Sequence, residues 1–122
     1  MKDIELSKKN NIEMLLLKII SEEDCYGYQI SQLIKELSGN LIVVPEGTMY
    51  PTLYKMLEKG YISDYRKKVG KRMERIYYHI EPQGVIRLEE LIDAYDKISH
   101  AIETILEYKV SELRTEGKIG NG

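Results

Sequence analysis

Cysteine, histidine and tryptophan are scarce in this chain of 122 residues. The only cysteine is Cys25, the two histidines are His79 and His100, and tryptophan is absent. A single cysteine excludes an internal disulfide and a cysteine-rich zinc site. Two histidines far apart in the sequence do not provide the usual ligands of a metal centre. We therefore expect no metal and no other cofactor.

Long apolar runs are also missing. The longest purely apolar segments, 14–17 and 41–44, have four residues each. A membrane-spanning helix needs about 20 apolar residues, and a secretory signal also has a longer apolar core. We therefore expect a cytoplasmic protein without a membrane segment. With 43% hydrophobic and 31% charged residues, the composition is typical of one compact domain.

Signatures of enzymes are not recognisable in the sequence. It contains no arrangement typical of a Ser/His/Asp or Cys/His site, no catalytic carboxylate pair and no phosphate loop of the form G-x-x-x-x-G-K-[ST]. We therefore expect a binding protein and not an enzyme.

Positive charge is concentrated in the middle of the chain, although the net charge is −2. Residues 41–81 carry a net charge of +3, whereas residues 1–40 and 82–122 carry −2 and −3. Six of the ten residues at 66–75 are lysine or arginine, opposed only by Glu74. Such a patch can bind DNA phosphates because binding releases condensed counterions. The alternative is an ordinary solvated turn.

Two amphipathic helices are predicted in the first part of the chain. Ser7 can cap the first, whose apolar residues recur at three- and four-residue spacing. These residues are Ile12, Leu15, Leu16, Ile19 and Ile20. The second helix is expected to begin near residues 25–26 and to end at Gly39-Asn40, a pair suited to a left-handed C-terminal cap. A short β-prone run follows at 41–44.

A third helix and a β-hairpin are predicted in the cationic segment. Because proline lacks an N–H, Pro51 is tolerated where that donor has no helical partner, so this helix should begin at 46–48 and end at Gly60. Strands are expected at 61–66 and 75–80. A helix followed by a charged β-ribbon is the order of a winged helix, which places the helix in the major groove and the ribbon against phosphates.

Nine side chains are candidates for contact with DNA. Those on the third helix, about 47–59, are Thr48, Met49, Tyr50, Thr52 and Lys55. The others are Tyr28 on the second helix and Lys71, Arg72 and Arg75 on the hairpin, whose basic part is about 66–75. For the third helix the alternative is a solvated edge, and for the tyrosines it is core packing.

A long helix is predicted from residue 82 to about residue 114. Its apolar residues recur in alternating steps of three and four. They include Leu88, Leu91, Tyr95, Ile98, Ile102, Leu106 and Val110. Such a helix would be ~45 Å long, which a domain of this size cannot cover alone. We expect two copies to pair through it as a two-fold dimer; the alternative is an intramolecular partner, including the first helix.

Four segments resemble motifs of the PadR family of transcriptional regulators, which is named for repressors of phenolic acid decarboxylase genes. Residues 26–30 resemble the family's Tyr-Gly-Tyr-Glu-Ile segment, and residues 45–53 its Pro-Gly-Thr-Leu-Tyr-Pro-x-Leu recognition helix with one extra residue. Residues 57–62 and 75–84 resemble the exit of that helix and the wing. The resemblance covers about residues 10–108 and is to the small subfamily with one long C-terminal helix.

This resemblance implies a mainly α fold with a small β-hairpin. It divides the chain into a winged helix-turn-helix domain at 1–81, a long C-terminal dimerisation helix at 82–114 and a flexible tail at 115–122. It implies a homodimeric regulator, most simply a repressor, that binds an inverted repeat in double-stranded DNA. The alternative is a winged-helix module that binds a ligand or a protein without binding DNA.

The resemblance also implies an effector site, because some family members hold a small aromatic or drug-like molecule between the two long helices. The corresponding residues here are Leu15, Ile92, Tyr95 and Asp96. Tyr95 stands where multidrug-sensing members carry a tryptophan, so a large planar cation would stack on less aromatic area.

Overall fold

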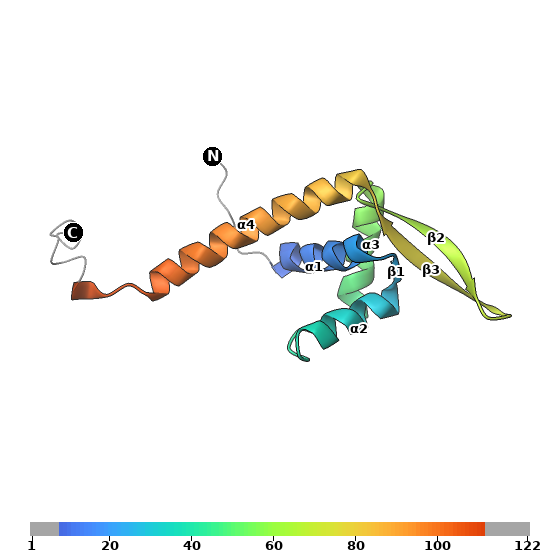
Figure 1. Cartoon of the computed structure of the whole chain (residues 1–122), viewed down its shortest axis with the longest axis horizontal. Coiled ribbons are helices and arrows are strands. Elements are labelled where there is room, and N and C mark those ends of the chain that lie inside the picture. The colour runs from blue at the N-terminus through green and yellow to red at the C-terminus, as the bar shows by residue number, and fades with distance from the viewer. Residues whose placement is uncertain (1–7, 112–122) are drawn as a thin grey trace.

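Four helices and a small sheet form the part of the chain that the computed structural model describes, residues 8–111 (Figure 1). In chain order they are α1 (Lys8–Glu22), β1 (Cys25–Tyr26), α2 (Gly27–Leu37), α3 (Glu46–Glu58), β2 (Ile62–Val69), β3 (Met73–Ile80) and α4 (Pro82–Leu106). Figure 1 shows β2 and β3 leaving the helical domain in one direction and α4 leaving it in the other. The predicted cap Ser7 and the predicted tail at 115–122 lie outside the described residues.

The core is built from the apolar faces of α1, α2, α3 and the sheet. Leu16, Leu17 and Ile20 of α1 are fully buried, which confirms the predicted stripe at Leu16 and Ile20. They belong to one cluster with buried residues of the other elements. Burying each such side chain contributes about 1.5–3 kcal/mol, so this cluster fixes the frame on which α3 and the hairpin are mounted.

The sheet has one more strand than the predicted hairpin. The strand order is β1-β3-β2, and both pairings are antiparallel. In the added strand Cys25 pairs with Tyr78 and Tyr26 pairs with Tyr77. Two residues are too few to show the alternation that predicts a strand. From the sequence, residues 25–26 therefore look like the first turn of the second helix. The β-prone run at 41–44 forms no strand.

The predicted end of α2 and the predicted start of α3 agree with the structure. Gly39 and Asn40 have φ angles of 62° and 68° after α2, which confirms the left-handed cap. α3 begins at Glu46, within the predicted range, although Pro51 lies inside the helix and not in its first turn. Its missing N–H leaves the Gly47 carbonyl without a helical donor, and because Gly47 is exposed, water can replace it.

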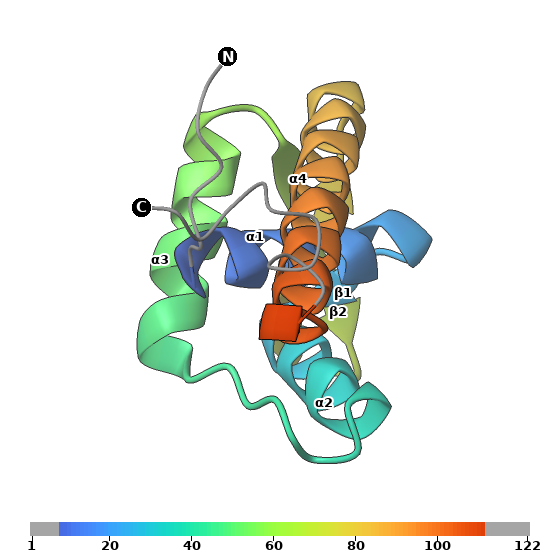
Figure 2. The same cartoon turned by 90° about the vertical axis from the view of Figure 1, so that its left-hand side faces the viewer.

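The long C-terminal helix is shorter than predicted. α4 has 25 residues, or ~37 Å, and it ends at Leu106 and not near residue 114; residues 112–114 lie outside the described part. α4 packs on α1, which it crosses in Figure 2, and Leu88 and Leu91 in its first half are buried. The prediction that these two leucines lie in a dimer interface is therefore wrong, because they belong to the core of the protomer.

The beginning of α4 is fixed by contact between backbones. The Glu81 N–H donates to the Tyr61 carbonyl at 2.9 Å. Gly84 packs against the same carbonyl so closely that a β-carbon at this position would collide with the Tyr61 backbone and with Ile80. A side chain at position 84 would therefore push α4 away from the end of the hairpin.

Candidate nucleic-acid interface

Small polar and cationic side chains cover the outer surface of α3. Thr48 and Lys55 are exposed and Thr52 is half-buried, so all three are accessible from solvent. Lys59 is exposed one turn beyond Lys55. The Thr52 hydroxyl donates to the Thr48 carbonyl at 2.8 Å, which leaves its oxygen free to accept a hydrogen bond from a base.

Met49 does not lie on this surface. Its side chain is only 1% exposed and packs in the core with Leu53 and Met56, so the predicted DNA contact at Met49 is wrong. These three residues are four and three positions apart and therefore share one face of the helix. Leu57 is only half-buried, so the buried face of α3 is centred on Met49, Leu53 and Met56.

Tyrosines line a groove of about 480 Å³ between α2, α3 and the sheet. Tyr28 and Tyr54 are 61% and 59% exposed at this groove, so their hydroxyls are accessible to a ligand. Tyr50 is half-buried, and a β-carbon at position 27 would collide with its ring, which explains the glycine there. Burial raises the pKa of Tyr50 above its ordinary value, so the hydroxyl remains a neutral donor.

The tip of the wing carries two exposed cations. Gly70 has a φ of 81° and allows the tight reversal between β2 and β3. Lys71 and Arg72 follow in the turn, are exposed, and form no ion pair with another residue of the range 8–111. Two like charges without a counterion at a narrow tip favour the approach of a polyanion.

Arg75 and Lys67 lie farther back on the wing and are held against aromatic rings. The Arg75 guanidinium carbon is 4.3 Å from the centre of the Tyr26 ring, and the Lys67 Nζ is 5.2 Å from that of Tyr77. The register pairs Lys67 with Arg75, so both project from the same face of the sheet. Arg75, which was predicted to contact DNA, is thus half-buried on a tyrosine and not at the tip.

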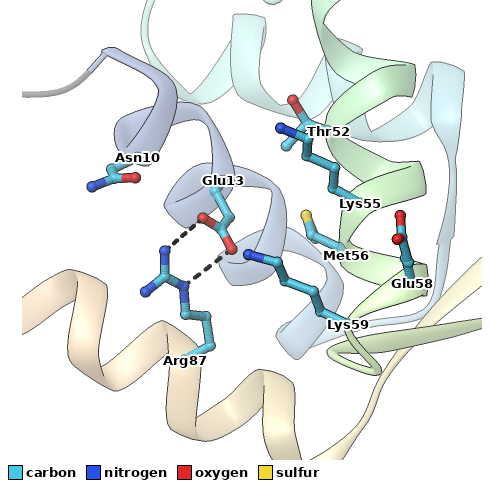
Figure 3. Close-up of a pocket in the computed structure, with 8 residues that line it drawn as sticks. All are labelled: Asn10, Glu13, Thr52, Lys55, Met56, Glu58, Lys59 and Arg87. Carbon is cyan, nitrogen blue, oxygen red and sulfur yellow. Dashed lines mark hydrogen bonds and ion pairs between the residues drawn. The ribbon is translucent and has the colours of Figure 1, made fainter.

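A second cavity, of about 310 Å³, lies between α1, α3 and α4 (Figure 3). Arg87 of α4 donates two hydrogen bonds to the Glu13 carboxylate of α1, at 3.1 Å from Nε and 2.9 Å from Nη2. Figure 3 shows Lys59 of α3 pointing toward this pair. The bidentate ion pair therefore fixes α4 on α1 beside the predicted recognition helix.

The remaining predicted interface residues lie mainly on the free surface of α4. Tyr95, Ile102 and Leu106 are exposed and Ile98 is half-buried; Val110 is exposed and follows the end of the helix. Of the predicted effector residues, Ile92, Tyr95 and Asp96 are exposed on α4, and Leu15 packs against the core from α1. These effector residues line neither of the two cavities described above.

Metal chemistry and membrane insertion find no support in the described part of the chain. Within residues 8–111, no three side chains of histidine, cysteine, aspartate or glutamate are grouped so that they could hold a metal ion. None of the helices formed by these residues has the length and apolarity needed to cross a bilayer. Cys25 is buried, and desolvation raises its pKa to about 11, so its thiol is an inert part of the core.

Residues on the outer face of the sheet were not predicted. They are Asp24, Tyr26, Tyr65, Lys67 and His79, which the strand register brings together with Arg75 and Tyr77. The alternation of 65 with 67 and of 75, 77 and 79 could have indicated one common face, but the pairing between strands was needed to join the two sets.

Comparison with known proteins identifies the family to which the chain is similar. Residues 16–90 match the model of the transcriptional regulator PadR-like family. The crystal structure of smu.1704 from Streptococcus mutans UA159 is 35% identical, with a TM-score of 0.73 over 84% of this chain and 92% of that one. A PadR-like transcriptional regulator from Bacillus cereus strain ATCC 14579 is 31% identical, with a TM-score of 0.71 over 83% of this chain and 96% of that one.

PadR of Bacillus subtilis, solved in complex with operator DNA, shares the fold. It is 22% identical, with a TM-score of 0.62 over 67% of this chain and 47% of that one. The predicted mainly helical winged-helix fold is confirmed by these likenesses, and so is the expectation that the chain is not an enzyme, because the family consists of transcriptional regulators. The chain therefore belongs to the PadR-like family of transcriptional regulators.

Proposed function

We propose that this regulator is a cytoplasmic homodimer that represses transcription by occupying an inverted repeat in duplex DNA. In this proposal α3 enters the major groove and the tip of the β2–β3 wing contacts phosphates or the minor groove. The carrying observation is that both elements expose cations without an ion-pair partner inside the described chain: Lys55 on α3 and Lys59 directly after it, and Lys71 and Arg72 at the wing tip.

The side chains around α3 fall into two groups, one suited to contact base edges and one suited to contact phosphates. Thr48 and Thr52 are small enough to approach base edges, where a hydroxyl can donate or accept. In this proposal Tyr28 and Tyr50, which line the groove, would donate hydrogen bonds to phosphates, and such contacts orient a protein on DNA without reading its sequence. The Bacillus subtilis PadR that was solved with operator DNA supports duplex DNA as the partner of this chain.

The distal half of α4 supports dimerisation. Every residue from 101 to 111 is exposed in the single chain, although Ile102, Ile105 and Leu106 are strongly apolar. A second copy placed about a two-fold axis would cover these side chains on both protomers at once. We expect Ile102→Glu to shift the protein toward the monomer in sedimentation velocity, because it would bury an unpaired carboxylate at the interface.

An effector site between the paired α4 helices completes the proposal. Ile92, Tyr95 and Asp96 are exposed on α4, and in the proposed dimer they would line the effector site together with Leu15 of α1. An aromatic ring, a carboxylate and aliphatic side chains suit a small aromatic cation. Such a molecule would relieve repression only by binding one spacing of the two helices more tightly than another.

The experiment is a selection of genomic fragments by the purified protein, followed by titration of the selected duplex at several salt concentrations. The test variant is Lys71→Ala/Arg72→Ala. The control, Lys18→Ala/Lys97→Ala, removes equal charge from exposed i,i+4 ion pairs away from α3 and the wing. A dimer would lose four phosphate contacts in the test variant, so the salt slope should fall by about 3.6.

The control variant should keep the wild-type affinity and nearly the wild-type slope. If the selection recovers no fragment above background, DNA is not the partner, and the chain is a winged-helix module for another ligand. If fragments are recovered but the two variants behave alike, the wing does not dock on the DNA.

A further inference from the structure

One carboxylate joins the body of the domain to both strands of the wing. Asp24 lies in the turn between α1 and β1. Its Oδ2 accepts a hydrogen bond from the Tyr65 hydroxyl of β2 at 2.7 Å, and its Oδ1 lies 2.8 Å from the His79 Nδ1 of β3. The partners are 41 and 55 residues away in the sequence, so these contacts determine how distant elements are arranged.

Aromatic rings extend this contact along the outer face of the wing. Tyr65 stacks on Tyr77 with 5.8 Å between ring centres, and Tyr77 meets the edge of Tyr26 at 5.5 Å. Tyr26 in turn lies under the Arg75 guanidinium. We call Asp24, Tyr65 and His79 the Asp24 clamp; the ring stack connects it to the cationic part of the hairpin.

The clamp acts where the wing is otherwise weakly held. In β2 only Ile62 is buried, and the residues from Asp64 to Lys68 are all exposed. The outer part of the hairpin therefore has little core contact to define its direction, and small rotations at the base would move Lys71 and Arg72 by several ångströms. The hydrogen bonds at the base of the hairpin therefore influence the position of its tip.

We propose that Asp24 is a positioning residue that sets the angle of the wing relative to α3, and that protonation of His79 strengthens this hold and with it the affinity for duplex DNA. This inference rests on the proposed function, in which the wing contacts DNA. Asp24 itself does not touch the nucleic acid in this proposal, and its effect is transmitted through Tyr65 and His79.

The direction of the pH dependence follows from the charged groups around the histidine. The hydrogen bond to Asp24, with smaller contributions from the charges of Asp24 and Glu81, raises the pKa of His79 above 6.5. Hydrogen bonds from His79 and Tyr65, aided by the charge of Lys67, lower the pKa of Asp24. The clamp is therefore fully ionic only between these two pKa values, and it weakens as the pH rises through the pKa of His79.

Substitutions at Asp24 separate positioning from simple charge. If Asp24 acted only as a negative charge near a polyanion, Asp24→Ala and Asp24→Asn would both tighten binding. We expect Asp24→Ala to weaken duplex binding about five-fold, and Asp24→Asn to weaken it less because the amide oxygen still accepts from Tyr65. Tyr65→Phe should weaken binding about two-fold with no change in charge. His79→Gln should weaken duplex binding below the pKa of His79, because glutamine cannot be protonated; His100→Gln, on α4, is its matched control and should leave affinity unchanged.

Tighter or unchanged binding by Asp24→Ala, with a wild-type thermal midpoint showing that the variant is folded, would overturn the proposal. NMR titration of His79 supplies a second readout. Its pKa should lie above the ordinary histidine value in the wild type and fall in Asp24→Ala, and the pH midpoint of DNA affinity should move with it. A wild-type pKa at or below 6.5 also refutes the clamp.

Failure of the proposed function would be visible separately, as absence of duplex binding by the wild type itself. In that case amide hydrogen exchange of β2 and β3 decides the positioning role. Asp24→Ala should accelerate exchange at the outer half of the hairpin by about ten-fold relative to the wild type. Equal exchange in the two proteins would show that Asp24 does not hold the wing.

Discussion

Replacing Gly84 with alanine tests whether α4 is seated on the hairpin as the structure shows. A β-carbon at this position would collide with the Tyr61 carbonyl group and with Cγ1 of Ile80. The carbonyl cannot easily move aside, because it accepts the Glu81 N–H at 2.9 Å. Relief would therefore require a displacement of the first turn of α4 itself.

Two opposing effects determine the magnitude. Alanine is the better helix former, by about 1 kcal/mol in a helix interior. Overpacking a close contact costs about 1–3 kcal/mol, and the upper end applies to Gly84 because the neighbour is backbone. We expect the free energy of unfolding to fall by about 2 kcal/mol, which corresponds to a loss of roughly 10 °C in Tm. Gly47→Ala is the control, since a β-carbon there meets nothing within 4 Å.

The assay is urea unfolding followed by circular dichroism, with all proteins at one concentration so that subunit association affects each equally. Gly47→Ala should be as stable as the wild type or slightly more stable. If Gly84→Ala shares that behaviour, helix propensity alone governs position 84, and α4 does not pack against Tyr61 as described.

Three further predictions concern the core and its ion pair. Gly27→Ala should destabilise the protein despite the gain in helix propensity, and Tyr50→Ala should remove this effect in the double variant by thermal unfolding, because the new methyl group meets the Tyr50 ring. Glu13→Ala should lower the free energy of unfolding by about 2 kcal/mol in urea titrations, since it leaves Arg87 without its bidentate partner; a loss near zero would make this an ordinary surface pair. Cys25, with its pKa raised to about 11, should react with a thiol reagent at about pH 8 only as fast as the protein opens, whereas rapid labelling of the folded protein would contradict its burial.

Elements that repeat over many residues could be predicted from the sequence. The buried face of the first helix is indicated by five apolar residues. The start of α3 and the Gly39-Asn40 cap of α2 follow from local backbone preferences. The hairpin is also evident, because Tyr and Ile enrich both strands around a glycine turn. These features depend on neighbours in the chain, which one sequence contains in full.

Features that depend on distant neighbours could not be predicted. Leu88 and Leu91 belong to the same heptad-like stripe as Ile102, and only the position of α1 decides that the first two are covered. Arg75 belongs to the same cationic run as Arg72, but strand pairing places it on Tyr26. Met49 is different, because its spacing of four residues to Leu53 and seven to Met56 predicts that all three share the buried face of the helix.

The two faces of the wing should contribute unequally to DNA binding. Arg66 and Lys68 alternate with Lys67 along β2, so they project from the face that also carries Glu74, whose carboxylate lies 3.7 Å from Arg66. Lys67 and Arg75 project from the opposite face and stack on tyrosine rings. We expect Arg66→Ala/Lys68→Ala to lower the salt slope of a dimer by about 3.6 and Lys67→Ala/Arg75→Ala to lower it much less. The two variants remove the same charge from neighbouring positions. Their comparison therefore separates the effect of the face from which a side chain projects from the effect of its charge. If both variants lower the salt slope equally, the DNA responds to the total charge of the hairpin, and the face from which each cation projects has no part in binding.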